Sequence, residues 1–175
     1  FSYPANFMLV GAMNPCKCGY YPDFTRCRCT ESSIRSYLNK ISRPLVDRVD
    51  ISVLAQEVNY ADMMESKKEE NSACIRKRVL EIHQLQWLRY QDESYQFNSQ
   101  IPPKQFEQYC VLTTESQNYL KMIFEKDRMS VRAYHKLIRV GRTIADMEHH
   151  ETIKLEDLLE AYCYREAEHT FWNCL

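Results

Sequence analysis

The chain has 175 residues, of which 45% are hydrophobic and 27% are charged. Its 23 lysines and arginines nearly balance its 24 aspartates and glutamates, and the resulting net charge of -1 excludes a strongly acidic or basic disordered chain. No apolar run approaches the ~18 residues of a membrane span, and the first residues lack the basic start of a signal peptide. We therefore expect a cytoplasmic protein without a membrane partner, and the apolar start of the chain suggests a piece of a longer protein.

The N-terminal part predicts the order strand, loop, helix, strand. Residues 7–13 form a continuous apolar run with the length of a strand that is buried on both faces, and Asn14 ends it. A helix is expected to begin after Thr30 and to be stopped by Pro44. Apolar and polar residues then alternate over 49–55, which predicts a second strand.

From residue 60 onward the apolar spacing is almost wholly helical. This change predicts a boundary between two domains, an α/β part over 1–58 and a helical part over 59–175. The expected fold class is α+β and mostly α-helical. The helices are expected at 72–91, 103–110, 114–126, 130–147 and 153–168.

Two of these helices carry apolar stripes that predict buried faces. The helix over 72–91 has its stripe at Ile75, Val79, Ile82 and Leu85. The helix over 130–147, with Ser130 as the expected N-cap, has its stripe at Val131, Tyr134, Ile138, Gly141 and Ala145.

The glycine content argues against a phosphate-binding loop. The chain contains only Gly11, Gly19 and Gly141. Loops that hold nucleotide phosphates need closely spaced glycines, because backbone N–H groups must approach the phosphate. The usual glycine-rich nucleotide site is therefore excluded within this chain.

Four of the eight cysteines fall within fourteen residues, at Cys16, Cys18, Cys27 and Cys29. Two C-x-C pairs separated by eight residues offer four thiolates for tetrahedral Zn(II). The C-x-x-C pair is the more usual zinc spacing, so reduced thiols without a metal are the alternative. Without a signal peptide, thiols or thiolate ligands are expected rather than disulfides.

Three polar residues occupy positions where ligand-binding groups are found. Asn14, at the end of the first expected strand, can face a ligand or simply form a turn. Arg48 can form a surface ion pair, or act in trans as an arginine finger on a neighbouring subunit's phosphoryl group. Arg132, in the first turn of a helix, suits an anion, but it can also belong to a solvated basic face with Arg139 and Arg142.

Basic residues concentrate between positions 16 and 48. Seven lysines and arginines stand there against three acidic residues, which gives a local charge of +4. A nucleic-acid backbone could bind such a segment, whereas the net charge of the whole chain argues against nucleic acid as its main ligand.

Three strings, in this order along the chain, resemble the magnesium chelatase-like AAA+ ATPases, the family that includes the ComM-type competence proteins. They are YPANFMLVGAMNPCKCGYY, RCRCTESSIRSYLNKISRPLVDRVDI and MSVRAYHKLIRVGRTIADME. The resemblance implies the C-terminal remnant of a parallel-sheet AAA+ core, followed by a helical lid. Arg43 departs from the pattern, since the family usually has glycine before this proline.

The resemblance also implies roles for the polar residues. Asn14 matches sensor 1, which orients the attacking water, and Arg48 matches the arginine finger that reaches the adjacent subunit's ATP. Arg132 matches sensor 2 of the lid, which responds to the γ-phosphate. The Walker A and Walker B segments that bind ATP and Mg(II) are expected before residue 1. The cysteines match an insertion found in part of the family, which does not identify a metal.

By the same resemblance, the parent protein is a ring, usually of six subunits, that couples ATP hydrolysis to DNA remodelling such as branch migration in natural transformation. Two alternatives stay open. One is a motor for metal insertion into a porphyrin, and the other is a zinc-dependent binding module whose arginines are structural. In each case we expect the isolated chain to be inactive as an ATPase.

Overall fold

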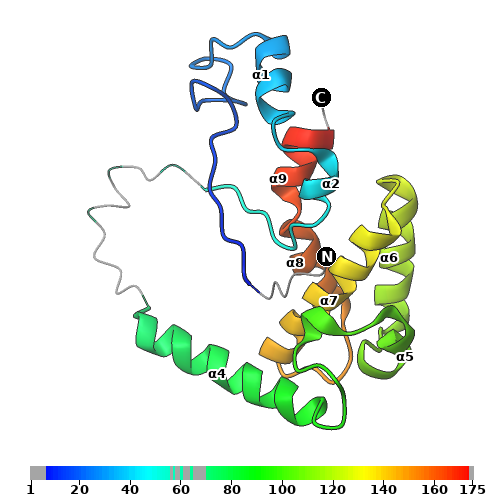
Figure 1. The fold of residues 1–175 in the computed structure, drawn as a ribbon. Helices are drawn as coiled ribbons and strands as arrows, with labels where there is room; N and C mark the ends of the chain where they lie inside the picture. The colour runs from blue at the N-terminus through cyan, green and yellow to red at the C-terminus, as the bar shows by residue number, and fades with distance from the viewer. Residues whose placement is uncertain (1–6, 56, 58–59, 61–63, 65–69, 174–175) are drawn as a thin grey trace, which may run out of the picture.

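The computed structural model describes residues 7–55, 57, 60, 64 and 70–173. This part of the chain is mostly helical, which confirms the helical expectation, and Figure 1 shows the helices arranged without a sheet. None of its helices is long and apolar enough to cross a membrane. The elements are α1 (Glu31–Leu38), α2 (Arg43–Val46), α4 (Ser72–Arg89), η1 (Asn98–Gln100), η2 (Pro103–Gln105), α5 (Phe106–Tyr109), α6 (Thr114–Lys126), α7 (Val131–Met147), α8 (Leu155–Cys163), α9 (Glu166–Glu168) and η3 (His169–Asn173).

The two segments expected to be strands are not strands in the described part of the chain. Residues 7–13 are exposed, and Met8 is 87% accessible. Residues 49–55 are also mostly exposed, and their backbone bonds are not those of a strand: the N–H of Val49 donates to the carbonyl oxygen of Val46 at 3.0 Å, and the N–H of Ser52 to that of Tyr164 at 2.7 Å. A strand requires a neighbouring strand to pair its N–H and C=O groups, and no described segment supplies one. The sheet remnant is therefore not observed, and the boundary expected at residue 58 lies outside the described residues.

The first helices follow the local signals, with one correction. Thr30 caps α1, because its hydroxyl accepts a hydrogen bond from the N–H of Ser33 at 3.3 Å. Ile34 and Leu38 are buried on one face of α1, as their spacing predicts. Pro44 does not end a helix but lies in the first turn of the short helix α2, where its missing N–H costs no hydrogen bond.

The main apolar core is built around α7, which packs most closely against α8. Gly141 permits this approach, since a Cβ atom there would lie 2.9 Å from Cδ2 of Leu158. Ser130 caps α7 through the N–H of Ala133 at 3.1 Å, which confirms the expected start. Of the stripe on this helix, Ile138, Gly141 and Ala145 are buried and Tyr134 is partly buried, whereas the first residue, Val131, is 62% exposed.

The long helix α4 begins where expected, but its apolar stripe is not a buried face. Only Ile82 of the stripe is buried, while Ile75 and Val79 are 43% and 44% exposed. Figure 1 shows why, since α4 projects away from the other helices and meets α7 only near its C-terminal end. The periodicity predicted the helix correctly and its burial incorrectly.

A buried ionic cluster joins that end of α4 to α7. Both guanidinium nitrogens Nη1 and Nη2 of Arg89 bind the carboxylate of Asp146, at 2.8 and 2.5 Å. Nη2 of Arg142 binds the same carboxylate at 2.8 Å, and Nδ2 of Asn98 binds it at 2.7 Å. The side chain of Asp146 is fully buried, and its single carboxylate pairs with two guanidinium groups, that of the buried Arg142 and that of the partly exposed Arg89.

Replacing Asp146 by asparagine is expected to destabilise the fold by about 3–5 kcal/mol, because the buried Arg142 and the partly buried Arg89 lose the one counter-charge that the described residues give them. Urea unfolding of the chain measures this loss. The control is Glu125→Gln, at an exposed position of α6, for which we expect a change within about 0.5 kcal/mol. A loss below about 1 kcal/mol for Asp146→Asn would show that the cluster is not important for stability.

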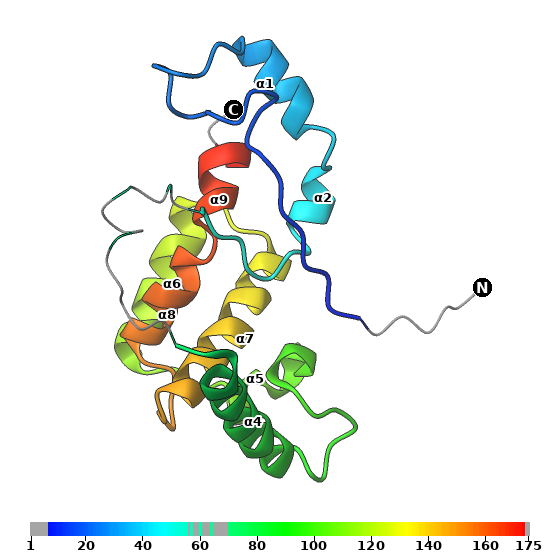
Figure 2. The same ribbon diagram turned by 90° about the vertical axis from the view of Figure 1, so that its left-hand side faces the viewer.

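The last expected helix is divided. The helix α8 ends at Cys163, and after a turn at Tyr164 and Arg165 the chain continues through α9 and η3. The guanidinium of Arg165 pairs with the carboxylate of Glu168 at 2.9 Å, and both side chains are buried. Figures 1 and 2 show α9 beside α1, so the C-terminal helices lie against the first helix of the chain.

Candidate functional site

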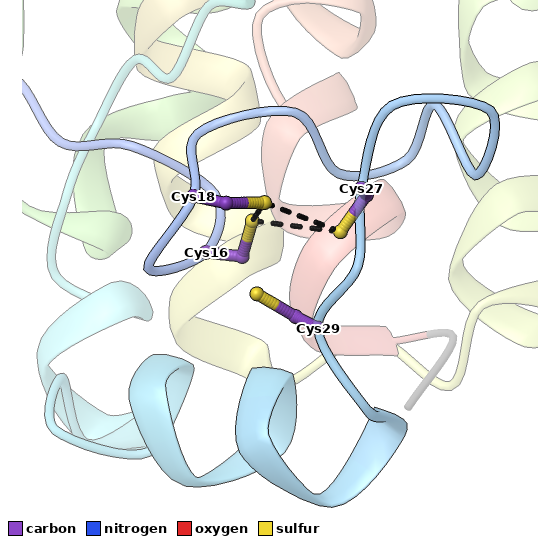
Figure 3. A group of neighbouring side chains, drawn as sticks. All are labelled: Cys16, Cys18, Cys27 and Cys29. Carbon is purple, nitrogen blue, oxygen red and sulfur yellow. Dashed lines mark hydrogen bonds between the residues drawn. The ribbon is translucent and has the colours of Figure 1, made fainter.

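The four clustered cysteines point toward one another from two short loops (Figure 3). The Sγ atoms of Cys16 and Cys18 are 3.3 Å apart, and Sγ of Cys27 lies 3.5 Å from Cys18 and 3.8 Å from Cys16. Cys29 completes the group, whose Sγ atoms all lie within 4.8 Å of one another. None of the four forms a disulfide.

These distances fit a tetrahedral zinc site. A Zn–S bond of about 2.3 Å in a tetrahedron places neighbouring sulfur atoms about 3.8 Å apart. The three measured separations reach that value or fall slightly below it, so small side-chain movements are enough to admit the ion. The described chain therefore brings together four cysteines that could hold a metal ion, and zinc binding stays a prediction beside the alternative of reduced thiols.

The loop between the two cysteine pairs is held by Asp23. Its carboxylate accepts hydrogen bonds from the N–H of Thr25 at 2.9 Å and from Nε of Arg26 at 2.7 Å. Bonds from the Thr25 hydroxyl and from Arg26 lower the pKa of Asp23 to about 2. The backbone N–H of Cys27 also binds the carbonyl oxygen of Asp23, at 2.8 Å, and this bond orients the second pair of ligands.

The pKa values of the Cys18 and Cys27 thiols are shifted in opposite directions. A backbone hydrogen bond from Tyr20, together with the thiol of Cys16, lowers the pKa of Cys18 to about 6. For Cys27 the backbone N–H of Cys29 lowers the pKa, but burial and the neighbouring thiols of Cys18 and Cys16 raise it more, to about 12. Cys18 is also exposed, and a lowered thiol pKa favours the thiolate, which is the form that binds a metal ion.

The cysteines are also part of an apolar cluster that includes the end of the chain. Cys16 and Cys27 are buried together with Ile34 and Leu38 of α1, and with Ala167 and Phe171 from the C-terminal helices. The ring of Phe171 lies 5.9 Å from that of Tyr21 in the cysteine loop. Anything that orders the cysteine loop therefore also orders the surface on which the C-terminal segment packs.

His150 and the carboxylates of Glu156 and Asp157 form a second group that could hold a metal ion. Hydrogen bonds within the chain explain this group without a metal. Nδ1 of His150 lies 3.0 Å from Oδ1 of Asp157, whose Oδ2 accepts a hydrogen bond from the N–H of Lys154 at 2.8 Å. Asp157 thus satisfies the start of α8, and His150 supports it. His150 is partly buried here.

Asn14 and Arg48 are exposed side chains at the surface of the N-terminal part. Asn14 lies in extended chain just before the cysteine loop, with Cγ 3.8 Å from the position of a Cβ on Gly19. Arg48 follows α2, and its Nη1 donates to the carbonyl oxygen of Pro44 at 2.5 Å. Among the described residues, Arg48 does not form the surface ion pair that was the alternative to an arginine finger.

The three arginines of α7 differ in what they contact. Arg142 is buried against Asp146, and Arg139 donates through Nη2 to the carbonyl oxygen of Ile101 at 2.7 Å. Arg132 is exposed in the first turn. The expectation of a common solvated face is therefore wrong for Arg142. No hydrogen bond or ion pair among the described residues joins Arg132 to Asn14 or Arg48.

Sequence reasoning missed Lys136, which is 5% exposed although it is charged. Its ammonium group donates to the backbone carbonyl oxygens of Asp47, at 3.2 Å, and of Val49. Burial lowers the pKa of Lys136, and the carboxylates of Glu168, Asp50 and Asp47 oppose that shift. The available signal was its position beside the apolar residues of a buried helix face.

Comparison with known protein families shows to which family this chain belongs. The family model described as "Magnesium chelatase, subunit ChlI C-terminal" matches residues 69–165, and "Magnesium chelatase, subunit ChlI" matches residues 1–63. The chain belongs to the magnesium chelatase-like AAA+ ATPase family. Its three motif strings all fall within the two matched ranges.

Among the relatives of this magnesium chelatase-like chain are proteins of the ComM type. It is 34% identical to YifB of Salmonella typhimurium over 94% of its own length, and 34% identical to competence protein ComM of Haemophilus influenzae over 93%. The YifB protein of Escherichia coli is 32% identical. The chain spans about a third of the length of these curated relatives.

Proposed function

We propose that this chain supplies the sensing and trans-acting half of an ATPase site in a ring-shaped assembly. In this proposal Asn14 orients the attacking water, Arg132 senses the γ-phosphate, and Arg48 reaches the ATP of the adjacent subunit. Family membership supports the proposal, because oligomers are common among AAA+ proteins of this family. A guanidinium held close to a transferring phosphoryl group stabilises the negative charge of the transition state.

The observation that carries the proposal is the difference between exposed and engaged arginines. On α7, Arg139 and Arg142 are used in contacts within the chain, whereas Arg132 is exposed next to the positive end of the helix dipole. Arg48 is likewise exposed at the end of α2. Residues that act on a ligand or on a neighbouring subunit must remain accessible, and these two do.

ATP and Mg(II) are the proposed cofactors of the longer protein. The three glycines of this chain do not form a phosphate-binding loop, so we propose that the groups that grip ATP lie in the remaining two thirds of the protein. The chain by itself is expected to show no ATP hydrolysis above background in a phosphate-release assay. Robust hydrolysis by residues 1–175 alone would contradict the split site.

DNA is the proposed substrate of the motor, and the support is the similarity to competence protein ComM. The basic segment adds little, because Arg26, Arg35 and Arg43 are engaged with Glu57, Glu31 and Glu168. The test is ATP turnover by the full-length protein with and without branched DNA. Stimulation by branched DNA, beyond that by linear duplex, supports DNA remodelling, and no stimulation by any DNA contradicts it.

A second candidate is a motor for metal insertion into a porphyrin, favoured by the matching magnesium chelatase models. The same assay distinguishes it, because such a motor would respond to its porphyrin-binding partner subunits and not to DNA. A third candidate, a zinc-dependent binding module with structural arginines, predicts that turnover does not depend on Arg48.

We also propose that the tetracysteine group binds one structural Zn(II). Four sulfur ligands at near-tetrahedral spacing leave no open coordination position for catalysis, so the ion would stabilise the loop instead. The loop has few apolar residues of its own, and metal binding supplies folding free energy in such small units.

A further inference from the structure

The buried lysine of α7 lies one helical turn after Arg132. Residues four apart in a helix share a face, so Lys136 and Arg132 are neighbours on α7. Arg132 is exposed, whereas Lys136 is covered by the segment that follows α2. One face of α7 therefore carries the expected sensor 2 residue and, next to it, an ammonium group in contact with another part of the chain.

The two carbonyl groups that Lys136 binds flank Arg48. They belong to Asp47 and Val49, and both bonds cross from α7 to a segment almost ninety residues earlier in the chain. The same segment is fixed further on, where Ser52 donates to the carbonyl oxygen of Tyr164 at 2.7 Å. The backbone on both sides of Arg48 is thus attached to the helical part, while the guanidinium remains at the surface.

Burying the charged Lys136 on this face of α7 is energetically unfavourable, so the ammonium group is expected to make contacts that an apolar side chain cannot make. Burying an ammonium group is unfavourable without hydrogen-bond partners, and an aliphatic residue would suit the buried face of α7 at least as well. Lysine has three N–H donors and can bind two carbonyl oxygens at once. It therefore fixes the direction of the backbone at residues 47–49, which packing alone does not do.

We propose that Lys136 is a positioning residue for Arg48, binding the carbonyl groups on either side of it so that the guanidinium is presented to the neighbouring subunit. The proposal rests on the function proposed above for Arg48. Since Lys136 and Arg132 lie on one helix face, a movement of α7 that follows the γ-phosphate also moves the arginine finger. Lys136 thus couples Arg132, which senses the γ-phosphate, to the arginine finger Arg48.

The test is steady-state ATP turnover by the full-length protein carrying Lys136→Met, which keeps the length of the side chain and removes its donors. We expect kcat to fall about 10- to 100-fold, because a displacement of about 1 Å of a catalytic group costs up to about 100-fold in rate. The KM and Kd for ATP are expected to stay unchanged. Lys136→Arg, which can still donate to both carbonyls, is expected to retain most of the turnover.

The matched control is Lys121→Met, at an exposed position of α6, for which no change in kcat is expected. In the background of Arg48→Ala, the Lys136→Met change should cost nothing further, because both act through one guanidinium. Full additivity of the two changes, or a loss of ATP affinity in place of kcat, would overturn the proposal.

Two other outcomes are also decisive. If Lys136→Met and Lys136→Gln both fail to fold or assemble, as judged by circular dichroism and light scattering, Lys136 holds the fold and not the finger, and the proposal is wrong. If Arg48→Ala itself leaves turnover unchanged, the proposed function fails. If Arg48→Ala abolishes turnover while Lys136→Met does not reduce it, only the positioning role fails.

Discussion

Replacing Arg48 by alanine in the full-length protein is expected to abolish ATP turnover while ATP binding stays near normal. The guanidinium is exposed, and among the described residues it bonds only to the carbonyl oxygen of Pro44, so its loss should not disturb the fold. Arginine fingers in analogous GTPases contribute about 10³ to 10⁵ in rate, because they stabilise charge that develops only in the transition state. We expect a decrease of similar size here.

Phosphate release measures the turnover of this variant, and binding of a fluorescent ATP analogue measures its affinity. The control is Arg76→Ala on α4, another exposed arginine, for which turnover should not change. A decrease in kcat together with unchanged Kd fits a transition-state role. Unchanged turnover in Arg48→Ala would exclude the arginine finger and favour a structural arginine.

The second large effect is expected at the tetracysteine group. Purified chain should contain one Zn(II), and Cys18→Ser should bind it far more weakly. Even the loss of an outer partner of a metal ligand costs about 10- to 100-fold in metal affinity, and the loss of a thiolate ligand should cost at least that much. Cys18 is the suitable position because it is exposed, so serine there leaves the apolar cluster of Cys16 and Cys27 in place.

Removal of the metal should also change the surroundings of Trp172, near the end of the chain. Trp172 packs against the apolar cluster that contains Cys16 and Cys27, and its carbonyl oxygen accepts a hydrogen bond from Nη1 of Arg43 at 2.7 Å. The protein has two tryptophans, so a Trp87→Phe background isolates the fluorescence of Trp172. Chelation of zinc should shift that emission to longer wavelength as the ring becomes exposed to water.

The matched control for these metal experiments is Cys74→Ser, at an exposed cysteine of α4 away from the cluster. It should keep the metal content and the Trp172 emission of the parent. Absence of zinc in chain purified without chelators would contradict the metal site. Zinc that can be removed without any change at Trp172 would contradict only its connection with the C-terminal segment.

Much of the helical architecture could be predicted from local signals. Ser130 and Thr30 are caps whose hydroxyl groups satisfy the N–H group three residues later, so they mark helix starts without tertiary information. The strands could not be treated in this way. The apolar run at 7–13 has the composition of a strand, but strand pairing depends on a neighbouring segment, and the described chain provides none.

The same distinction applies to the candidate sites: groupings of residues that are close in sequence could be predicted, and contacts between distant residues could not. The tetracysteine group was visible because its ligands are close in sequence, and the distances between their Sγ atoms fit that interpretation. The contacts of Asp146 and Lys136 were not visible. Arg142 and Asp146 have the i, i+4 spacing of a helix pair, but Arg89 reaches Asp146 across 57 residues, and Lys136 reaches Asp47 across 89. Such pairings exist only once the helices have packed.

The central claim is that Arg48 acts on the nucleotide of a neighbouring subunit, and mixed assemblies test it most directly. Subunits carrying Arg48→Ala can still bind ATP, whereas subunits with a disabled ATP-binding loop still carry Arg48. Each preparation alone should be inactive, and mixing them should restore turnover, because an intact ATP site then meets an intact arginine from the adjacent subunit. A mixture that is as inactive as its two components would contradict the account.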